Sequence, residues 1–171
     1  MTNLLSNPGF ETNTTGWNPF GSAPIARSTS QAHNSVASCL MARDGAGNKG
    51  VQISTFFKIA VNANKQYTFG CWVFAETEAS TIVLRMQYYD MAGSGGSATS
   101  NSVATGVAIP MGVWTHVQYT TRSDASAAGF VGYAYTTSGT NPSNVYYDDF
   151  VLVEVGSASL LNVFQLRPIA R

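Results

Sequence analysis

QYTFGCWVFA, residues 66–75, alternates between two kinds of side chain with a period of two. One side of an extended chain would carry a continuous apolar row, Tyr67, Phe69, Cys71 and Val73. The other side would carry Trp72 and Phe74 among smaller residues. Successive side chains of a β-strand point to opposite faces of the sheet, and aromatic and β-branched residues favour strands. The stretch therefore predicts a strand with one face in an apolar core.

The same period recurs along most of the chain. Four further runs show it clearly, at 80–90, 113–121, 128–138 and 144–155, and three weaker candidates come earlier, at 23–31, 35–44 and 49–59. Gly, Pro, Asn and Ser bound these runs, and no segment has a convincing helical period. The sequence predicts an all-β domain over residues 1–155, a jelly-roll β-sandwich of two antiparallel sheets. Residues 90–102, rich in Gly and Ser, are expected to form a surface loop.

The composition argues against nucleic-acid and membrane partners. Only 11% of the 171 residues are charged, against about 25% in typical soluble domains. Nine basic side chains balance nine acidic ones, so no net charge attracts nucleic acid or an anionic membrane, and neither is expected as a partner. The N-terminus lacks the pattern of a signal peptide, and no apolar stretch is long enough for a membrane span. We expect a protein made in the cytoplasm, and association with a virion is one route by which it would leave the cell.

The cysteines and histidines give no sign of catalysis. Cys39 and Cys71 lie in strand-like runs and are either two buried thiols or one bridge between neighbouring strands. His33 and His116 accompany no G-x-S-x-G motif and no zinc-ligand spacing. Asp148 and Asp149 are consecutive on a strand, so they are expected to point to opposite faces and not to form a glycosidase pair. We expect no enzyme activity.

Several motifs together resemble a known family. They are NLLSNPGFE at 3–11 followed by Gly16-Trp17, YTFGCWVFA at 67–75, WTHV at 114–117 and VYYDDFVLVEV at 145–155. This combination resembles the carbohydrate-binding modules found beside xylanase and cellulase catalytic domains. The resemblance implies a two-sheet jelly roll in which the first and last strands lie close together.

The resemblance also implies a structural calcium ion. An acid of the opening motif and an acid of the closing motif would hold it, which here means Glu11 and one of Asp148 and Asp149. Strand alternation favours Asp148, and Asp44 is a third candidate. Without the resemblance, Glu11 could simply cap the Asn-Pro-Gly turn and the aspartates could end a strand.

The family binds glycans across a sheet, with aromatic rings against sugar rings and polar side chains at the hydroxyls. Trp72 matches a position where the family often carries a platform aromatic residue. From strand alternation, the side chains out of phase with the core are expected to join it on one face if their strands are neighbours. The predicted ligand-binding set is Trp72, Arg85, Gln87, Tyr89, His116 and Gln118.

Two functions from different classes fit these features. The first is a non-catalytic module that binds a polysaccharide or surface glycan and holds a structural calcium. The alternative is a phage or virion structural protein, a capsid decoration or tail-associated protein on the same fold. The apolar residues of the tail 156–171 are expected to pack either on this sandwich or on another subunit, and in the second case they would contact capsid or other virion subunits. They are Leu160, Leu161, Val163, Phe164 and Leu166.

Overall fold

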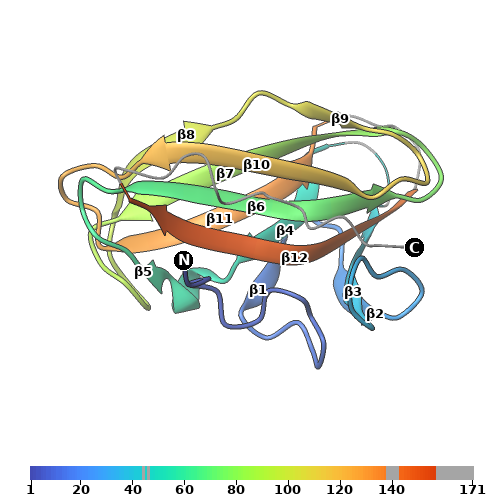
Figure 1. Cartoon of the computed structure of the whole chain (residues 1–171), viewed down its shortest axis with the longest axis horizontal. Helices are drawn as coiled ribbons and strands as arrows, with labels where there is room; N and C mark the ends of the chain where they lie inside the picture. The colour runs from blue at the N-terminus through green and yellow to red at the C-terminus, as the bar shows by residue number, and fades with distance from the viewer. Residues whose placement is uncertain (44, 46, 138–142, 157–171) are drawn as a thin grey trace.

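Two antiparallel β-sheets face each other in the computed structural model, which describes residues 1–43, 45, 47–137 and 143–156. The five-stranded sheet has the order β10-β6-β12-β3-β2, and Figure 1 shows β10, β6 and β12 in front. Its strands are β2 (Ile25–Ser28), β3 (Ser38–Arg43), β6 (Gln66–Ala75), β10 (Thr115–Arg122) and β12 (Ser143–Val155).

The second sheet has seven strands in the order β1-β4-β11-β7-β8, with β5 beside β11 and β9 beside β7. Its strands are β1 (Trp17–Phe20), β4 (Lys49–Ile53), β5 (Ile59–Ala60), β7 (Ser80–Tyr89), β8 (Ala98–Val103), β9 (Val107–Ile109) and β11 (Gly129–Thr136). A single 3-10 turn, η1 (Thr55–Phe57), precedes β5. The all-β jelly-roll prediction is confirmed.

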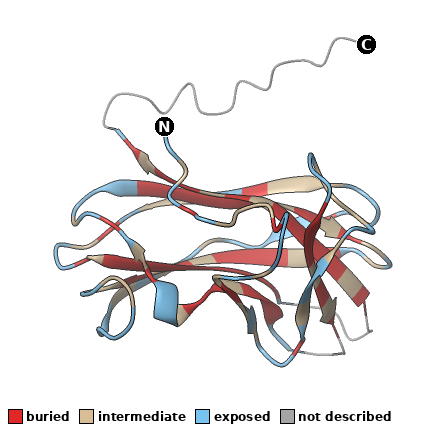
Figure 2. Ribbon diagram, turned by 90° about the horizontal axis from the view of Figure 1, so that it is seen from below, coloured by how far each residue is buried: buried red, intermediate tan, exposed pale blue. Residues whose placement is uncertain are grey.

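The core lies between the two sheets, where Figure 2 shows the buried residues on facing strands. The predicted inner row of β6, from Tyr67 to Val73, is fully buried. Phe69 in this row packs against Phe130 of β11, with ring centroids 5.6 Å apart. A Cβ added to Gly132 would lie 2.5 Å from the Phe69 ring, so β11 needs glycine there to let the sheets approach.

The opening stretch of the chain lies beside the second half of β12. The Asn3 side chain donates to the carbonyl of Phe150 and accepts from the Leu152 amide, and the Leu4 amide donates to the Leu152 carbonyl. Trp17 packs on Phe150 with ring centroids 4.3 Å apart. The two ends of the domain are therefore joined, as the family resemblance implies.

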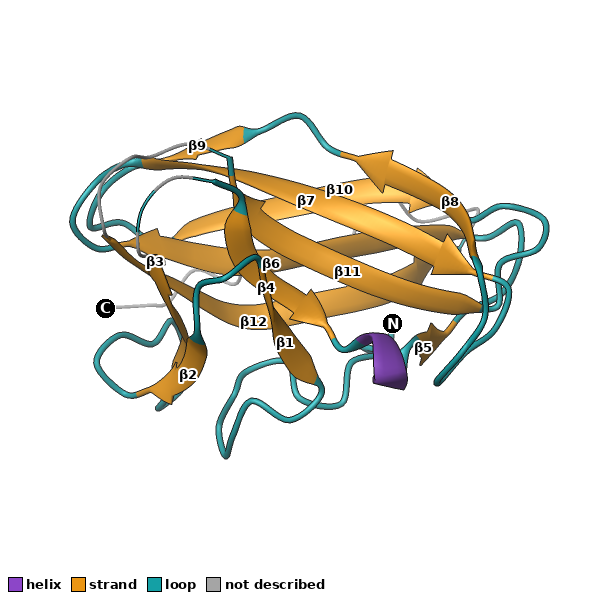
Figure 3. Ribbon diagram, turned by 180° about the vertical axis from the view of Figure 1, so that it is seen from behind, coloured by secondary structure: helices purple, strands orange, loops and turns teal. Residues whose placement is uncertain are grey.

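Some sequence predictions differ from the structure. Residues 98–102, predicted as loop, belong to β8, because an edge strand that is polar on both sides lacks the alternation of a core strand. The predicted strand 49–59 is broken by η1. Figure 3 shows β8 and β9 one after the other along the edge of β7 that faces away from β11. Cys39 and Cys71 are buried free thiols.

Residues 157–171, most of the predicted apolar tail, lie outside the described residues. Among the residues that are described, no helix has the length and apolar character needed to cross a membrane.

Candidate functional site

The predicted ligand-binding residues divide between the two outer faces of the sandwich. Arg85, Gln87 and Tyr89 point outward from β7 in the seven-stranded sheet. Trp72 of β6 and two residues of β10, His116 and Gln118, lie on the five-stranded sheet. The expectation of one shared face is wrong, because β6 and β7 are consecutive in the chain but belong to different sheets.

Aromatic residues from three strands gather on the outer face of the seven-stranded sheet. Tyr133 of β11 lies between Gln52 of β4 and Arg85 of β7. Tyr135 lies opposite Gly50, which has no side chain, and Phe20 of β1 packs there with a ring centroid 4.9 Å from that of Tyr135. The sequence places both tyrosines on one side of β11, but nothing in it indicates that this side is the outer one.

A polar network covers this aromatic group. The guanidinium carbon of Arg85 lies 4.4 Å from the Tyr133 ring centroid. Arg85 donates from Nε to Oδ1 of Asn101 at 2.8 Å and from Nη2 to Oε1 of Gln87 at 2.6 Å. The Tyr133 hydroxyl donates to the same Gln87 oxygen at 2.8 Å. Burial raises the pKa of Tyr133 to about 12, so its hydroxyl stays protonated and remains a donor.

Lys58 lies at one end of the same face, beside Tyr89. Its Nζ lies 4.9 Å from the Tyr89 ring centroid and is buried. It donates to the carbonyls of Thr55 and Gly93, both at 3.0 Å, and to the carbonyl of Gly95. The lysine thereby ties the glycine-rich loop to the sheet edge beside Tyr89.

The outer face of the five-stranded sheet centres on Trp72. The ring of His33, from the loop before β3, stacks on Trp72 at 3.8 Å, and His116 lies beside it at 5.2 Å. Burial lowers the pKa of His116, and the nearby His33 lowers it further. Gln118 is exposed and lies opposite Gly70. Trp72 is therefore half-buried, with one ring face covered by His33.

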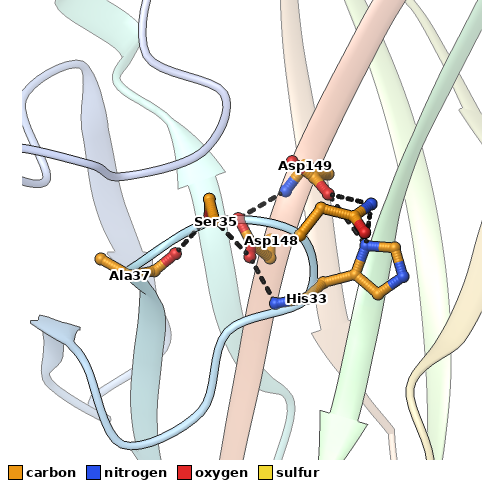
Figure 4. Close-up of polar contacts among 6 residues, drawn as sticks. His33, Ser35, Ala37, Asp148 and Asp149 are labelled. Atoms are coloured by element: carbon orange, nitrogen blue, oxygen red, sulfur yellow. Dashed lines mark hydrogen bonds and ion pairs between the residues drawn. The ribbon is translucent and has the colours of Figure 1, made fainter.

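An acidic cluster lies beside this stack, and Figure 4 shows its two aspartates with His33. The buried Asp148 accepts hydrogen bonds from the backbone amides of His33 at 2.9 Å and Asp149 at 2.8 Å. Asp149 contacts Nδ1 of His33 at 2.9 Å and accepts from the Asn34 side chain at 3.2 Å. The loop before β3 is thus bonded to both aspartates.

Glu11 reaches the same place from the opening stretch. A Cβ added to Gly9 would lie 3.4 Å from a Glu11 carboxylate oxygen, 3.7 Å from one of Asp148 and 3.9 Å from one of Asp149. Burial raises the pKa of Asp148, and the charges of Asp149 and Glu11 raise it further. The hydrogen bonds that the carboxylate accepts lower the pKa but do not outweigh these effects, so the pKa is about 6. Three carboxylates from the two ends of the domain therefore converge.

A β-bulge explains why both aspartates take part. The pairing of β12 with β6 shifts register between Asp148 and Val151, and Asp149 has a φ of 47°. A bulge breaks the alternation of side chains. The prediction that consecutive aspartates point to opposite faces is therefore wrong here.

The cluster can be tested as a calcium site. Its donors are hard carboxylate oxygens, as calcium requires. Within the described part of the chain, no three His, Cys, Asp or Glu side chains are arranged to hold a metal ion. The three carboxylates instead contact groups of the loop before β3. Asp44, the third predicted ligand, lies outside the described residues. The carboxylates fit calcium in donor type, but the described residues do not present them in an arrangement that would hold an ion.

Residues 2–143 match the family model described as a carbohydrate binding domain. The chain belongs to this family. Its sequence is 26% identical over 158 residues to endo-1,4-beta-xylanase A of Thermotoga maritima, covering 92% of this chain and 14% of that protein. This carbohydrate binding domain thus spans a small part of the curated relative that it matches.

Solved structures share the fold of this carbohydrate binding domain. The CBM22-1 xylan-binding domain of Paenibacillus barcinonensis Xyn10C superposes with a TM-score of 0.71 at 19% identity, covering 92% of this chain and 97% of that one. The enzymatically active domain of tailspike protein 4 from bacteriophage CBA120 superposes with a TM-score of 0.67 at 12% identity, covering 90% of this chain and 21% of that one. At identities this low, both likenesses show a shared fold.

Proposed function

We propose that this domain binds a glycan on the outer face of its seven-stranded sheet and does not catalyse a reaction. The observation that carries the proposal is the network of Arg85, Gln87 and Asn101 over the aromatic group of Phe20 and Tyr133. Aromatic rings offer apolar surface to the C–H faces of sugar rings, and amides and a guanidinium offer hydrogen bonds to hydroxyls.

A xylan-type polysaccharide is the first candidate ligand. The solved structures with this fold include domains described as xylan-binding, and the curated relative is a xylanase. Tyr133 is only 5% exposed, so the sugar would contact chiefly the polar network and the aromatic residues at its margin, Phe20 and Tyr89.

Trp72, His116 and Gln118 form a separate candidate patch on the five-stranded sheet. A glycan on the first face does not reach them, because the core separates the two faces. Their predicted role in binding therefore stands as a second proposal that needs its own variants.

We also propose a structural calcium at Glu11, Asp148 and Asp149, joining the opening stretch to β12. Calcium would offset the repulsion among three converging carboxylates. The role predicted for a virion protein depends on residues 156–171, of which 157–171 lie outside the described part, so it stays a prediction.

Titration calorimetry with xylohexaose and soluble xylan tests the proposed face. Gln87→Ala and Gln118→Ala make a matched pair, since each removes one glutamine from opposite outer faces. We expect Gln87→Ala to weaken binding about tenfold or more, from the loss of hydrogen bonds to the ligand. We expect Gln118→Ala to bind as the unmodified protein does.

The opposite result, with binding lost only in Gln118→Ala or Trp72→Ala, would move the site to the five-stranded sheet. If folded protein binds neither xylan nor any other glycan on an array, the proposed function is overturned. Thermal unfolding of each variant checks that it is folded.

A further inference from the structure

The outer face of the seven-stranded sheet carries one charged side chain from its strands, that of Arg85. The other outward positions of the described strands hold aromatic, aliphatic, amide, hydroxyl and small residues, among them Phe20, Gln52, Thr81, Gln87 and Asn101. No carboxylate is among them. The chain has no net charge, but this face of it is positive.

Arg85 has no acidic partner among the described residues. Its two hydrogen bonds go to amide oxygens of Asn101 and Gln87, so part of its donor fork is free for a ligand. The stack on Tyr133 and these two bonds hold the guanidinium plane in one orientation. A fixed guanidinium binds a carboxylate through paired hydrogen bonds, at a lower cost in side-chain entropy than a mobile one.

Three acids beside β7 and β8 are engaged with other groups. Asp90 accepts from the Ser97 amide at 2.7 Å, Asp124 accepts from the Thr99 hydroxyl at 2.7 Å, and Glu78 pairs with Arg43. Lys58 adds a second positive charge at the Tyr89 end, held by backbone carbonyls. The positive charge of the face is therefore not neutralised by the described residues.

We infer that this face selects glycans that carry a carboxylate, as on a uronic acid unit, and that Arg85 is the residue that recognises it. The inference rests on the proposed glycan-binding function and specifies its ligand class. A neutral glycan would use the guanidinium only as a donor to hydroxyls, whereas a uronate would complete the hydrogen bonding of Arg85 with a charge-assisted pair.

A xylo-oligosaccharide bearing one glucuronic acid branch, and the same compound with the carboxyl group reduced to an alcohol, form a matched pair of probes. Titration calorimetry at low salt is expected to show at least about tenfold tighter binding of the acidic probe. Added sodium chloride should reduce this preference, because salt screens charge attraction. Arg85→Gln should remove the preference, and Arg85→Lys should retain part of it.

Arg122→Gln is the matched control, because Arg122 is an exposed arginine of β10 on the other sheet and should leave the preference unchanged. Equal affinity for the two probes, or a preference that survives in Arg85→Gln, overturns the inference and leaves the glycan-binding proposal standing. Failure of folded protein to bind either probe or xylohexaose overturns both. Should Arg85→Gln not fold, the salt dependence of the unmodified protein decides the matter, since a salt-independent preference contradicts the inference.

Discussion

The imidazole ring of His33 lies flat on the indole ring of Trp72, with centroids 3.8 Å apart and 18° between the ring planes. The same histidine donates its backbone amide to Asp148 and contacts Asp149 through Nδ1. The stack on Trp72 therefore stabilises the position of the loop before β3 beside the acidic cluster. The residue that the sequence suggests as a sugar platform is also a support for the proposed metal site.

Trp72→Ala is expected to lower the free energy of unfolding by about 2 kcal/mol, less than the loss of a fully buried Trp, since the indole is half-buried. Urea unfolding with and without calcium measures this. The stabilisation by calcium should shrink in the variant, because the His33 loop loses its support. Phe20→Ala is the control for calcium stabilisation, since Phe20 is a half-buried aromatic residue of the other sheet that packs on Tyr133 and Tyr135 and not on His33 or Trp72. Normal calcium stabilisation together with lost glycan binding would contradict this role.

Calcium removal tests the acidic cluster directly. Addition of calcium to chelator-treated protein should raise the free energy of unfolding by about 2.7 kcal/mol at a concentration one hundred times the Kd. Glu11→Gln and Asp148→Asn should abolish most of this gain, whereas Asp90→Asn, at a carboxylate bonded to the Ser97 amide, should not change it. If calcium leaves the free energy of unfolding of the unmodified protein unchanged, the site is ruled out.

Sequence patterns predicted strands well where one face enters the core. The predicted run 66–75 coincides with β6, and 80–90 and 144–155 differ from β7 and β12 by one residue at an end. A period of two requires only that alternate residues be apolar, which holds for every strand next to the core. β8 was missed because it is an edge strand without an apolar row.

The site was less predictable, for two physical reasons. Alternation assigns residues to a face of their own strand, but it cannot tell which sheet the strand joins, so Trp72 and Arg85 were grouped although they lie on opposite faces. The bulge that brings Asp148 and Asp149 together is a local departure from the pleat, and its sequence is compatible with a regular strand. The convergence of Glu11 with the aspartates came from the family resemblance.

Asp124 should make stability depend on acid pH. Burial acts to raise the pKa of this carboxyl, but hydrogen bonds from Ser100, Thr99 and Ser126 outweigh it and hold the pKa well below its usual range. A lowered folded-state pKa gives stability that is present above the unfolded value, about 3.9, and is lost as the pH falls below it.

Asp124→Asn is therefore expected to cost about 1 kcal/mol at pH 7, allowing for solvent screening, and less at pH 3. Urea unfolding at a series of pH values compares the two proteins. Asp90→Asn serves as a control at another loop carboxylate. A cost that does not shrink on acidification would show that Asp124 acts through packing and not through its charge.

Lys58→Met is expected to loosen the glycine-rich loop 90–97. The variant keeps an apolar stem against Tyr89 but loses the hydrogen bonds to the carbonyls of Thr55, Gly93 and Gly95. Hydrogen exchange of amides in 90–97 should become faster, while that of β6 stays unchanged. Lys65→Met, at an exposed lysine, is the control, and unchanged exchange of the loop in Lys58→Met would show that other contacts hold it.

Gly132→Ala tests how closely the two sheets are packed. A Cβ there would lie 2.5 Å from the Phe69 ring, so the ring or β11 must move, and overpacking of this kind costs about 1–3 kcal/mol. Gly156→Ala is the matched control, because no atom of the described residues, apart from its chain neighbours, lies within 4 Å of its added Cβ. Adding Phe69→Leu to Gly132→Ala should restore part of the lost stability, since the smaller side chain makes room for the methyl group. Urea unfolding measures all three variants, and a Gly132→Ala protein as stable as Gly156→Ala would mean that the sheets lie farther apart at this point than the structure places them.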